Sequence, residues 1–172
     1  RKRETAYKIR IGELLKSNRI FDQSNSNNYQ SINPRLLHAE LGSKKIVRVN
    51  IIANLIDKFE SEGERRFASI TLDDGSGQIK IRVFGEDVKK FEEFVQGDTL
   101  LVIGLLRSFN QELYILPEII RKQDPKYLLV RKLEIEKSSP KSLTTEQKKE
   151  IRAFRDDLIE IIKSSEKNQG IE

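Results

Sequence analysis

The stretch Gln78–Phe84 has the alternation of a β-strand and carries residues that could do chemistry on one face. Successive side chains of a strand point to opposite sides, so the isoleucines and the valine of one parity form its core side. Lys80, Arg82 and Phe84 then share the solvent side. A ring in water beside two cations suits a single-stranded nucleic acid, because the ring stacks on a base and the cations contact phosphates. Taken alone, the strand allows equally that Phe84 caps the strand end beneath a neighbouring loop.

The composition excludes several kinds of site. The chain has 172 residues, enough for one domain with a real core and appendages but hardly for two full domains. It has no Cys, which excludes disulfides and thiolate metal sites, and a single His, His38, which rules out a His-pair metal site. We therefore expect no metal and no cofactor. No apolar run approaches the length of a membrane span, and we expect an intracellular protein with no membrane partner.

The formal net charge of +5 is unevenly distributed. Residues 1–50 hold 11 Lys and Arg residues against 4 Asp and Glu, whereas residues 51–100 hold 7 against 11. A basic N-terminal third suggests an anionic partner. For residues 1–3 alone, a solvated flexible tail is the better interpretation.

The N-terminal third has the weakest pattern. Scattered apolar residues between Ile9 and Ile20 indicate a short docked element, and a polar tract at residues 22–28 predicts a loop or insertion over residues 20–43. A long strand follows over residues 46–56. Near Ile52 both parities become apolar, as expected for a strand that bends and is buried on both sides in a small barrel.

Four more elements follow this long strand. Residues 67–72 and 78–84 are predicted strands joined by a turn rich in Asp and Gly, and residues 99–106 and 112–116 are two more. Gly104 inside the fourth strand predicts a bulge or a sharp bend. Pro117 is expected to end the fifth strand.

Between the third and fourth strands, residues 86–95 have helical periodicity. Their apolar face would consist of Val88, Phe91, Phe94 and Val95. The order β-β-β-α-β-β is that of the OB-fold, a partly open five-stranded Greek-key barrel. We therefore predict an all-β OB-fold barrel with a helix between strands 3 and 4, followed by C-terminal α-helices.

In this fold the outer face of strands 2 and 3 and the loops joining strands 1–2 and 4–5 bind oligonucleotides. The candidate nucleic-acid-binding residues are Lys58, Arg65, Arg66, Lys80, Arg82, Phe84, Arg107, Phe109 and Asn110. Phe109 lies in a polar loop and is assigned to stack on a base opposite Phe84, the alternative being that it folds back onto the barrel rim. Each stack is worth about 1–3 kcal/mol. Three glutamates dilute the charge of the first loop, so the groove is that of a modest binder.

Two helices are predicted after the barrel. Asp124 and Pro125 suit the start of the first, over about residues 125–137, which has Leu129, Val130 and Leu133 on one side. The second opens at Thr145 with an apolar stripe. The residues assigned to subunit assembly are Leu129, Leu133, Ile151, Phe154, Leu158, Ile161 and Ile162. The alternative is that the second helix packs on its own barrel or on its neighbour.

The segment Leu105–Asn110, followed by Leu113, resembles the strand 4–5 region of the middle subunit of replication protein A, in which a Leu-Arg-Ser-Phe stretch carries a base-stacking Phe. Residues 72–84 resemble the strand 2–3 hairpin of that family. Its eukaryotic members have a stacking Trp at the position of Phe84. The resemblance covers about residues 11–121, and the style and length suggest an archaeal member.

The resemblance implies a single-stranded DNA-binding subunit of a heterotrimer that acts in DNA replication, repair and recombination. Its partners would be single-stranded DNA and the large and small subunits, with primase or DNA polymerase as further candidates. The family assembles through helices that follow its barrels, which favours the partner-helix interpretation. The protein would be cytoplasmic and nucleoid-associated if archaeal, and nuclear if eukaryotic. The resulting division is a basic arm (residues 1–9), the OB-fold domain (10–123) and a helical assembly segment (124–172).

Three other interpretations stay open. The chain could be an RNA- or tRNA-binding OB-fold of the anticodon type, a telomere-capping subunit related to replication protein A, or mainly an assembly subunit with a weak groove. We expect no enzyme and no catalytic residue. Asp73, Asp74 and Glu86 could be imagined as a metal cluster, but the first two lie in a hairpin turn, where structural Asp is common.

Overall fold

The structure is a computed structural model that describes residues 3–22, 34–61, 66–138, 155 and 159. The chain divides into two compact units, residues 1–135 and 136–172. The barrel and the part of the following helix up to Ile135 lie in the first unit. The three-part division predicted from the sequence stays a prediction.

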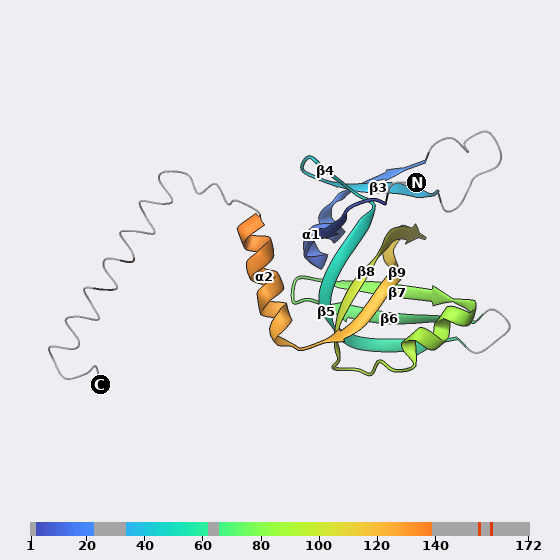
Figure 1. Ribbon diagram of the computed structural model, residues 1–172. Coiled ribbons are helices and arrows are strands. Elements are labelled where there is room, and N and C mark those ends of the chain that lie inside the picture. Colours follow the sequence, from blue (N-terminus) through green and yellow to red (C-terminus); the bar gives the residue numbers. More distant parts are fainter. Residues whose placement is uncertain (1–2, 23–33, 62–65, 139–154, 156–158, 160–172) are drawn as a thin grey trace, which may run out of the picture. The chain divides into compact units, whose positions relative to one another are not determined.

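Five strands form the barrel (Figure 1). They are β5 (Arg48–Glu60), β6 (Phe67–Asp73), β7 (Gln78–Phe84), β8 (Thr99–Phe109) and β9 (Glu112–Gln123). The first half of β5 pairs antiparallel with β8 and the second half with β6. A short parallel pairing between β7 and β9, at residues 80–81 and 114–115, completes the ring. The predicted OB-fold barrel is confirmed.

Strict alternation builds the inner face of β6 and β7, where every second residue is buried. On β5 the alternation stops where Ile51, Ile52 and Ala53 are all buried. Ile51 and Ala53 belong to the core, whereas Ile52 lines a depression together with Leu128 and Ile135. The β8–β9 register shifts between Ile103 and Gly104, which confirms the predicted bulge. A side chain at Gly104 would collide with the backbone of Leu116, so only glycine fits this close approach.

Several strand boundaries differ from the prediction. β8 runs on to Phe109 instead of ending at residue 106, so Phe109 ends a strand and does not lie in a loop as predicted. β9 continues through Pro117 to Gln123 instead of ending at the proline. Pro117 lies opposite Gly104, at the irregularity in the ladder, where a missing amide donor is tolerated. β5 extends to Glu60 and so takes in the start of the predicted charged loop.

The predicted helix between strands 3 and 4 is present as a 3₁₀-helix, η1 (Gly85–Phe91). Val88, Phe91 and Phe94 are buried as expected. Val95 is 59% exposed, so its assignment to the same face was wrong. The chain leaves the helix after Phe91, and the amide of Val95 donates a hydrogen bond to the carboxylate of Asp98, which ends helical periodicity.

The loop predicted over residues 20–43 is wrong for its second part. β2 (Asn18–Phe21), β3 (Leu36–Leu41) and β4 (Lys44–Ile46) form a three-stranded antiparallel sheet. Leu36, Ala39 and Ile46 join the hydrophobic core. The buried positions 36 and 39 are three apart, so β3 lacks the two-residue period that reveals a strand. Most of the polar tract lies outside the described residues.

The N-terminal elements dock on the barrel. β1 (Ala6–Lys8) pairs in parallel with β5, and α1 (Ile11–Lys16) begins against the β6–β7 turn. The amide of Ile11 donates to a carboxylate oxygen of Asp74 at 2.9 Å, and that of Gly12 donates to the hydroxyl of Ser76 at 2.9 Å. The turn aspartate thus satisfies a free amide at the start of a helix, which is a structural role.

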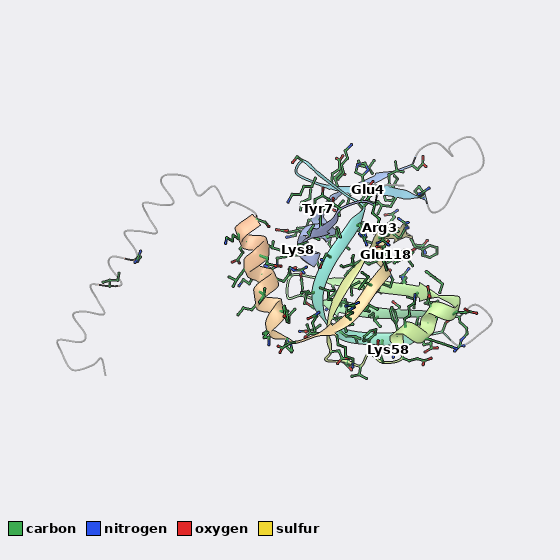
Figure 2. All side chains as sticks on the ribbon, in the orientation of Figure 1. Arg3, Glu4, Tyr7, Lys8, Lys58 and Glu118 are labelled. Atoms are coloured by element: carbon green, nitrogen blue, oxygen red, sulfur yellow. The ribbon has the colours of Figure 1, made fainter. Side chains whose placement is uncertain are left out.

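The helix α2 (Lys126–Ser138) begins where Asp124 accepts a hydrogen bond from the amide of Lys126 at 3.0 Å. Its Arg131 is 7% exposed and donates to the backbone and side-chain oxygens of Asn50. Glu134 accepts from Arg131 at 3.1 Å and from Lys8 at 2.8 Å, and Figure 2 shows Lys8 facing α2. The hydrogen bond from Lys8 lowers the pKa of Glu134.

The opposite side of α2 faces solvent. It carries Leu129, Val130 and Leu133, of which Leu129 is 66% exposed and Leu133 60%. The assembly residues Ile151, Phe154, Leu158, Ile161 and Ile162 lie outside the described residues. In the part of the chain that is described, no helix is long and apolar enough to cross a membrane.

Two valines of one segment test the packing around η1. Val88 is 2% exposed and Val95 59%. We expect Val88→Ala to lower the free energy of unfolding by about 1–3 kcal/mol, because it removes buried methyl groups and leaves a cavity. The matched Val95→Ala should change it by less than about 0.5 kcal/mol. Urea denaturation followed by circular dichroism measures both, and equal losses would contradict the described end of η1.

Candidate nucleic-acid interface

A groove of about 680 Å³ runs over the outer side of β7 and the β8–β9 hairpin. Its lining residues are Phe67, Arg82, Phe84, Phe109, Asn110, Gln111, Glu112 and Tyr114. The structure therefore brings together four residues that the sequence assigned to the site, which are Arg82, Phe84, Phe109 and Asn110. These come from strand β7 and from the hairpin, as the OB-fold order requires.

The two rings assigned to base stacking are both accessible. Phe84 is 53% exposed and Phe109 49%. Neither is sealed beneath a loop or against the rim by the described residues, so each has a ring surface to offer a ligand. A flat ring that is half buried is held in place by its packing and still presents one side to a base.

Phe84 belongs to a row of three rings that runs across the sheet. Its ring centroid lies 6.5 Å from that of Phe67, and the centroid of Phe67 lies 5.6 Å from that of Phe59. Phe67 is directly opposite Phe84 in the β6–β7 register. Sequence reasoning missed Phe59 and Phe67. For Phe67 the signal was available, since it shares the outward parity of its strand with Ser69 and Thr71.

The cations on β7 are paired with one carboxylate. Glu112 accepts a hydrogen bond from Lys80 at 2.9 Å and from Arg82 at 2.8 Å. The guanidinium of Arg82 also lies over the ring of Tyr114, 5.0 Å from its centroid. The hydrogen bond from Lys80 and the charges of both cations hold the pKa of Glu112 below its ordinary value. Glu112 therefore stays ionised at neutral pH.

A tight turn places Phe109 and Glu112 on the groove. Asn110 and Gln111 have φ angles of 49° and 64°, and they form a two-residue connection between β8 and β9. Two consecutive positive φ angles are those of a type I′ hairpin turn, at which Asn is favoured. Phe109 and Glu112 are direct partners in the register, so their side chains leave the hairpin on the same face.

The other predicted site residues lie elsewhere or are occupied by the protein itself. Lys58 donates to the carbonyl oxygens of Phe91 at 2.6 Å and Phe94 at 3.2 Å, and Figure 2 shows it at the end of the barrel that carries η1. Arg66 pairs with Glu60 at 3.4 Å, and Arg107 donates to the carbonyl of Leu106. Arg65 lies outside the described residues.

The groove continues toward the N-terminal elements. A second depression of about 400 Å³ shares Gln111 and Glu112 with the groove and is also lined by Arg19 and Lys80. Arg19, on β2, donates a hydrogen bond to the carbonyl of Gln111. Arg19 was not among the predicted site residues, because no strand pattern was recognised around it that would carry it to the hairpin. Lys80 lies on this extension and not on the wall of the main groove.

The described residues contain no group of three or more His, Asp or Glu side chains that could hold a metal ion. Asp73 and Asp74 are instead occupied within the β6–β7 turn. Asp73 accepts a hydrogen bond from the amide of Gly75, and Asp74 accepts from Ser76 as well as from Ile11.

Comparison with known proteins places this barrel in a class. Residues 48–123 match the family described as "OB-fold nucleic acid binding domain". These residues are β5 to β9 with η1, so the barrel is an OB-fold domain. An uncharacterised protein of Methanocaldococcus jannaschii is 42% identical over 64 residues, which are 35% of this chain and 28% of that protein. The match thus spans less than a third of that relative.

Solved structures give the more particular likeness, to replication protein A. A chain of a replication protein A heterotrimer bound to single-stranded DNA aligns with 76% of this chain and 92% of its own length, at a TM-score of 0.57 and 18% identity. A chain of yeast replication protein A bound to single-stranded DNA aligns with 82% of this chain and 96% of its own length, at a TM-score of 0.55 and 21% sequence identity. The resemblance predicted from the sequence is confirmed at the level of the fold.

A third solved structure has a similar fold. A chain of the Stn1–Ten1 complex of Schizosaccharomyces pombe aligns with 56% of this chain and 73% of its own length, at a TM-score of 0.50 and 19% identity. The sequence identity to these three structures is 18–21%, so the similarity shows a common fold and nothing more specific.

The structural role of Lys58, which donates to the carbonyls of Phe91 and Phe94, can be tested by measuring the free energy of unfolding. We expect Lys58→Met to lower the free energy of unfolding by about 1 kcal/mol, because two carbonyls at the end of η1 lose a charged donor. Lys80→Met should leave it within about 0.5 kcal/mol, because its pair with Glu112 is exposed. Parallel urea denaturation compares the two variants. A Lys58 variant as stable as the wild type would return this residue to the list of free cations.

Proposed function

We propose that the protein is a non-enzymatic subunit of a replication protein A-like complex and binds single-stranded DNA in its OB-fold groove. The observation that carries the proposal is the pair of half-exposed rings, Phe84 and Phe109, on one groove that also contains Arg82. Bases would stack on the rings while cations contact the phosphates. Two of the structures with a similar fold are described as bound to single-stranded DNA, which supports the proposal.

The proposal includes assembly with other subunits through the C-terminal helices. The apolar side of α2, with Leu129, Val130 and Leu133, is exposed, whereas its other side is fixed to the barrel by Arg131 and Ile135. A helix that is docked on one side and apolar on the other suits a helical bundle. The large and small subunits of such a complex would supply the other helices. The complex would act in replication, repair and recombination, at the nucleoid of an archaeal cell.

A second candidate function is favoured by one observation. Glu112 pairs with both Lys80 and Arg82, so the three side chains together keep only one net positive charge. That arrangement also fits a subunit whose main role is assembly and whose own binding is weak. Direct binding measurements separate the two candidates.

The groove is tested by fluorescence anisotropy with labelled pyrimidine single strands of DNA and RNA at two salt concentrations. We expect the wild type to bind DNA and to lose affinity as salt rises, through release of counterions. The double variant Phe84→Ala, Phe109→Ala should bind at least about 30-fold more weakly, since each stack contributes about 1–3 kcal/mol. Tyr127→Ala, which removes an exposed ring from α2, is the control.

Three results of this titration would change the proposal. Unchanged affinity of the double variant would show that the stacking site is wrong. Tighter binding of RNA than of DNA would favour an RNA-binding module. Absence of binding to either strand would leave the chain an assembly subunit.

The assembly surface is tested by purifying the tagged full-length chain from its own cells. We expect other OB-fold subunits to copurify with the wild type and with Lys89→Asp, a charge change at an exposed position of η1 instead of α2. The double variant Leu129→Asp, Leu133→Asp should lose them, because it places two charges in an apolar interface. Mass spectrometry identifies the subunits, and a circular dichroism melt confirms that the variant is folded. Retention of the subunits by this variant would contradict the role of α2.

A further inference from the structure

We propose that the carboxylate of Glu112 occupies a phosphate position of the empty groove, and that a phosphodiester of the bound single strand displaces it from Lys80 and Arg82. Glu112 would then set the affinity and the salt dependence of the groove. This inference rests on the proposed nucleic-acid binding and assigns a role to a residue that is not itself expected to contact the ligand.

The contacts of Glu112 are those that a phosphodiester would make. Its oxygen Oε1 accepts from Nζ of Lys80 at 2.9 Å, and Oε2 accepts from Nη2 of Arg82 at 2.8 Å. Each of the two oxygens thus takes one cation. The two non-bridging oxygens of a phosphodiester share one negative charge and accept from Arg and Lys in the same way.

The carboxylate can leave while Arg82 stays in place. The Glu112 side chain is 50% exposed and follows directly after the two-residue turn, so it can swing into solvent. The Arg82 side chain is only 17% exposed, and its guanidinium stays against the ring of Tyr114 at 5.0 Å. The cation is therefore held for an incoming anion by a contact that does not involve Glu112.

Glu112 lies where the proposed nucleic-acid ligand would be bound. It lines the same groove as Phe84 and is the register partner of Phe109. A nucleotide whose base stacks on either ring brings its phosphate into this groove. Among the residues that the structure describes, Arg82 and Glu112 are the charged ones that line this groove, and their charges cancel until the carboxylate moves away.

The variant Glu112→Gln distinguishes two roles of this carboxylate: competing with phosphate for the two cations, or holding the cations in place for phosphate. If Glu112 merely holds the two cations in a binding geometry, its loss loosens them and weakens binding. If it competes with phosphate, its loss strengthens binding. We expect Glu112→Gln to bind a labelled thymidine strand of about 15 nucleotides, within the site size of one OB barrel, more tightly than the wild type. An exposed carboxylate competing for two cations corresponds to a gain of about 3- to 10-fold at low salt.

The salt dependence gives a second readout. The plot of log affinity against log salt should become steeper by about 0.7 for Glu112→Gln, which corresponds to one more neutralised phosphate on a single strand. Glu118→Gln is the matched control, because it removes the same charge from the same strand and ends an ion pair with Arg48 outside the groove. We expect its affinity and slope to equal those of the wild type.

A double-mutant cycle identifies the cations through which Glu112 acts. In a Lys80→Met, Arg82→Met background, Glu112→Gln should no longer raise the affinity. The inference is overturned if Glu112→Gln binds as the wild type does or more weakly, or if Glu118→Gln shows the same gain. In those cases DNA binding by the wild type would still stand. If no variant binds DNA, the proposed function and this inference fall together.

Discussion

The pairing of one barrel strand, β5, with two other strands of the barrel is the constraint on which the structure depends. Its first half forms a ladder with β8 and its second half with β6, so the strand must bend between them. The partner of β5 changes at Asn54, which pairs with both β8 and β6, and the register with β6 shifts just beyond it, between Leu55 and Asp57. On the far side, Gly104 gives β8 the close approach to β9 that closure needs.

Closure of the barrel determines which side chains of β6 and β7 face outward, and these side chains form the candidate site. With the inner faces of β6 and β7 filled by apolar side chains, residues of the other parity must face solvent together: Phe67 beside Phe84, and Arg82 between the rings and the hairpin. The type I′ turn at 110–111 then adds Phe109 and Glu112 to the same groove. The result is a surface rich in rings, on which one carboxylate pairs with two cations.

Much of this was predictable from the sequence, for reasons that differ between elements. Two-residue alternation revealed β6 and β7 and placed Lys80, Arg82 and Phe84 on one face. Alternation says nothing about partners, so it could not show that Glu112 pairs with two of these residues or that Lys58 binds the end of η1. The sheet of β2, β3 and β4 was missed because its burial comes from tertiary packing and not from a regular period. The side of α2 that docks was missed because it uses a buried Arg131.

The measurement that tests the account most directly is an NMR titration of the isotope-labelled protein with a thymidine single strand. The account predicts that the largest chemical-shift changes fall on the groove, at the amides of residues 82–84 and 109–112 and at the ring protons of Phe84 and Phe109, where stacked bases add ring currents. Changes confined to the β2–β3–β4 sheet or to α2, with the groove unaffected, would contradict it, because the strand would then be bound by another surface of the molecule.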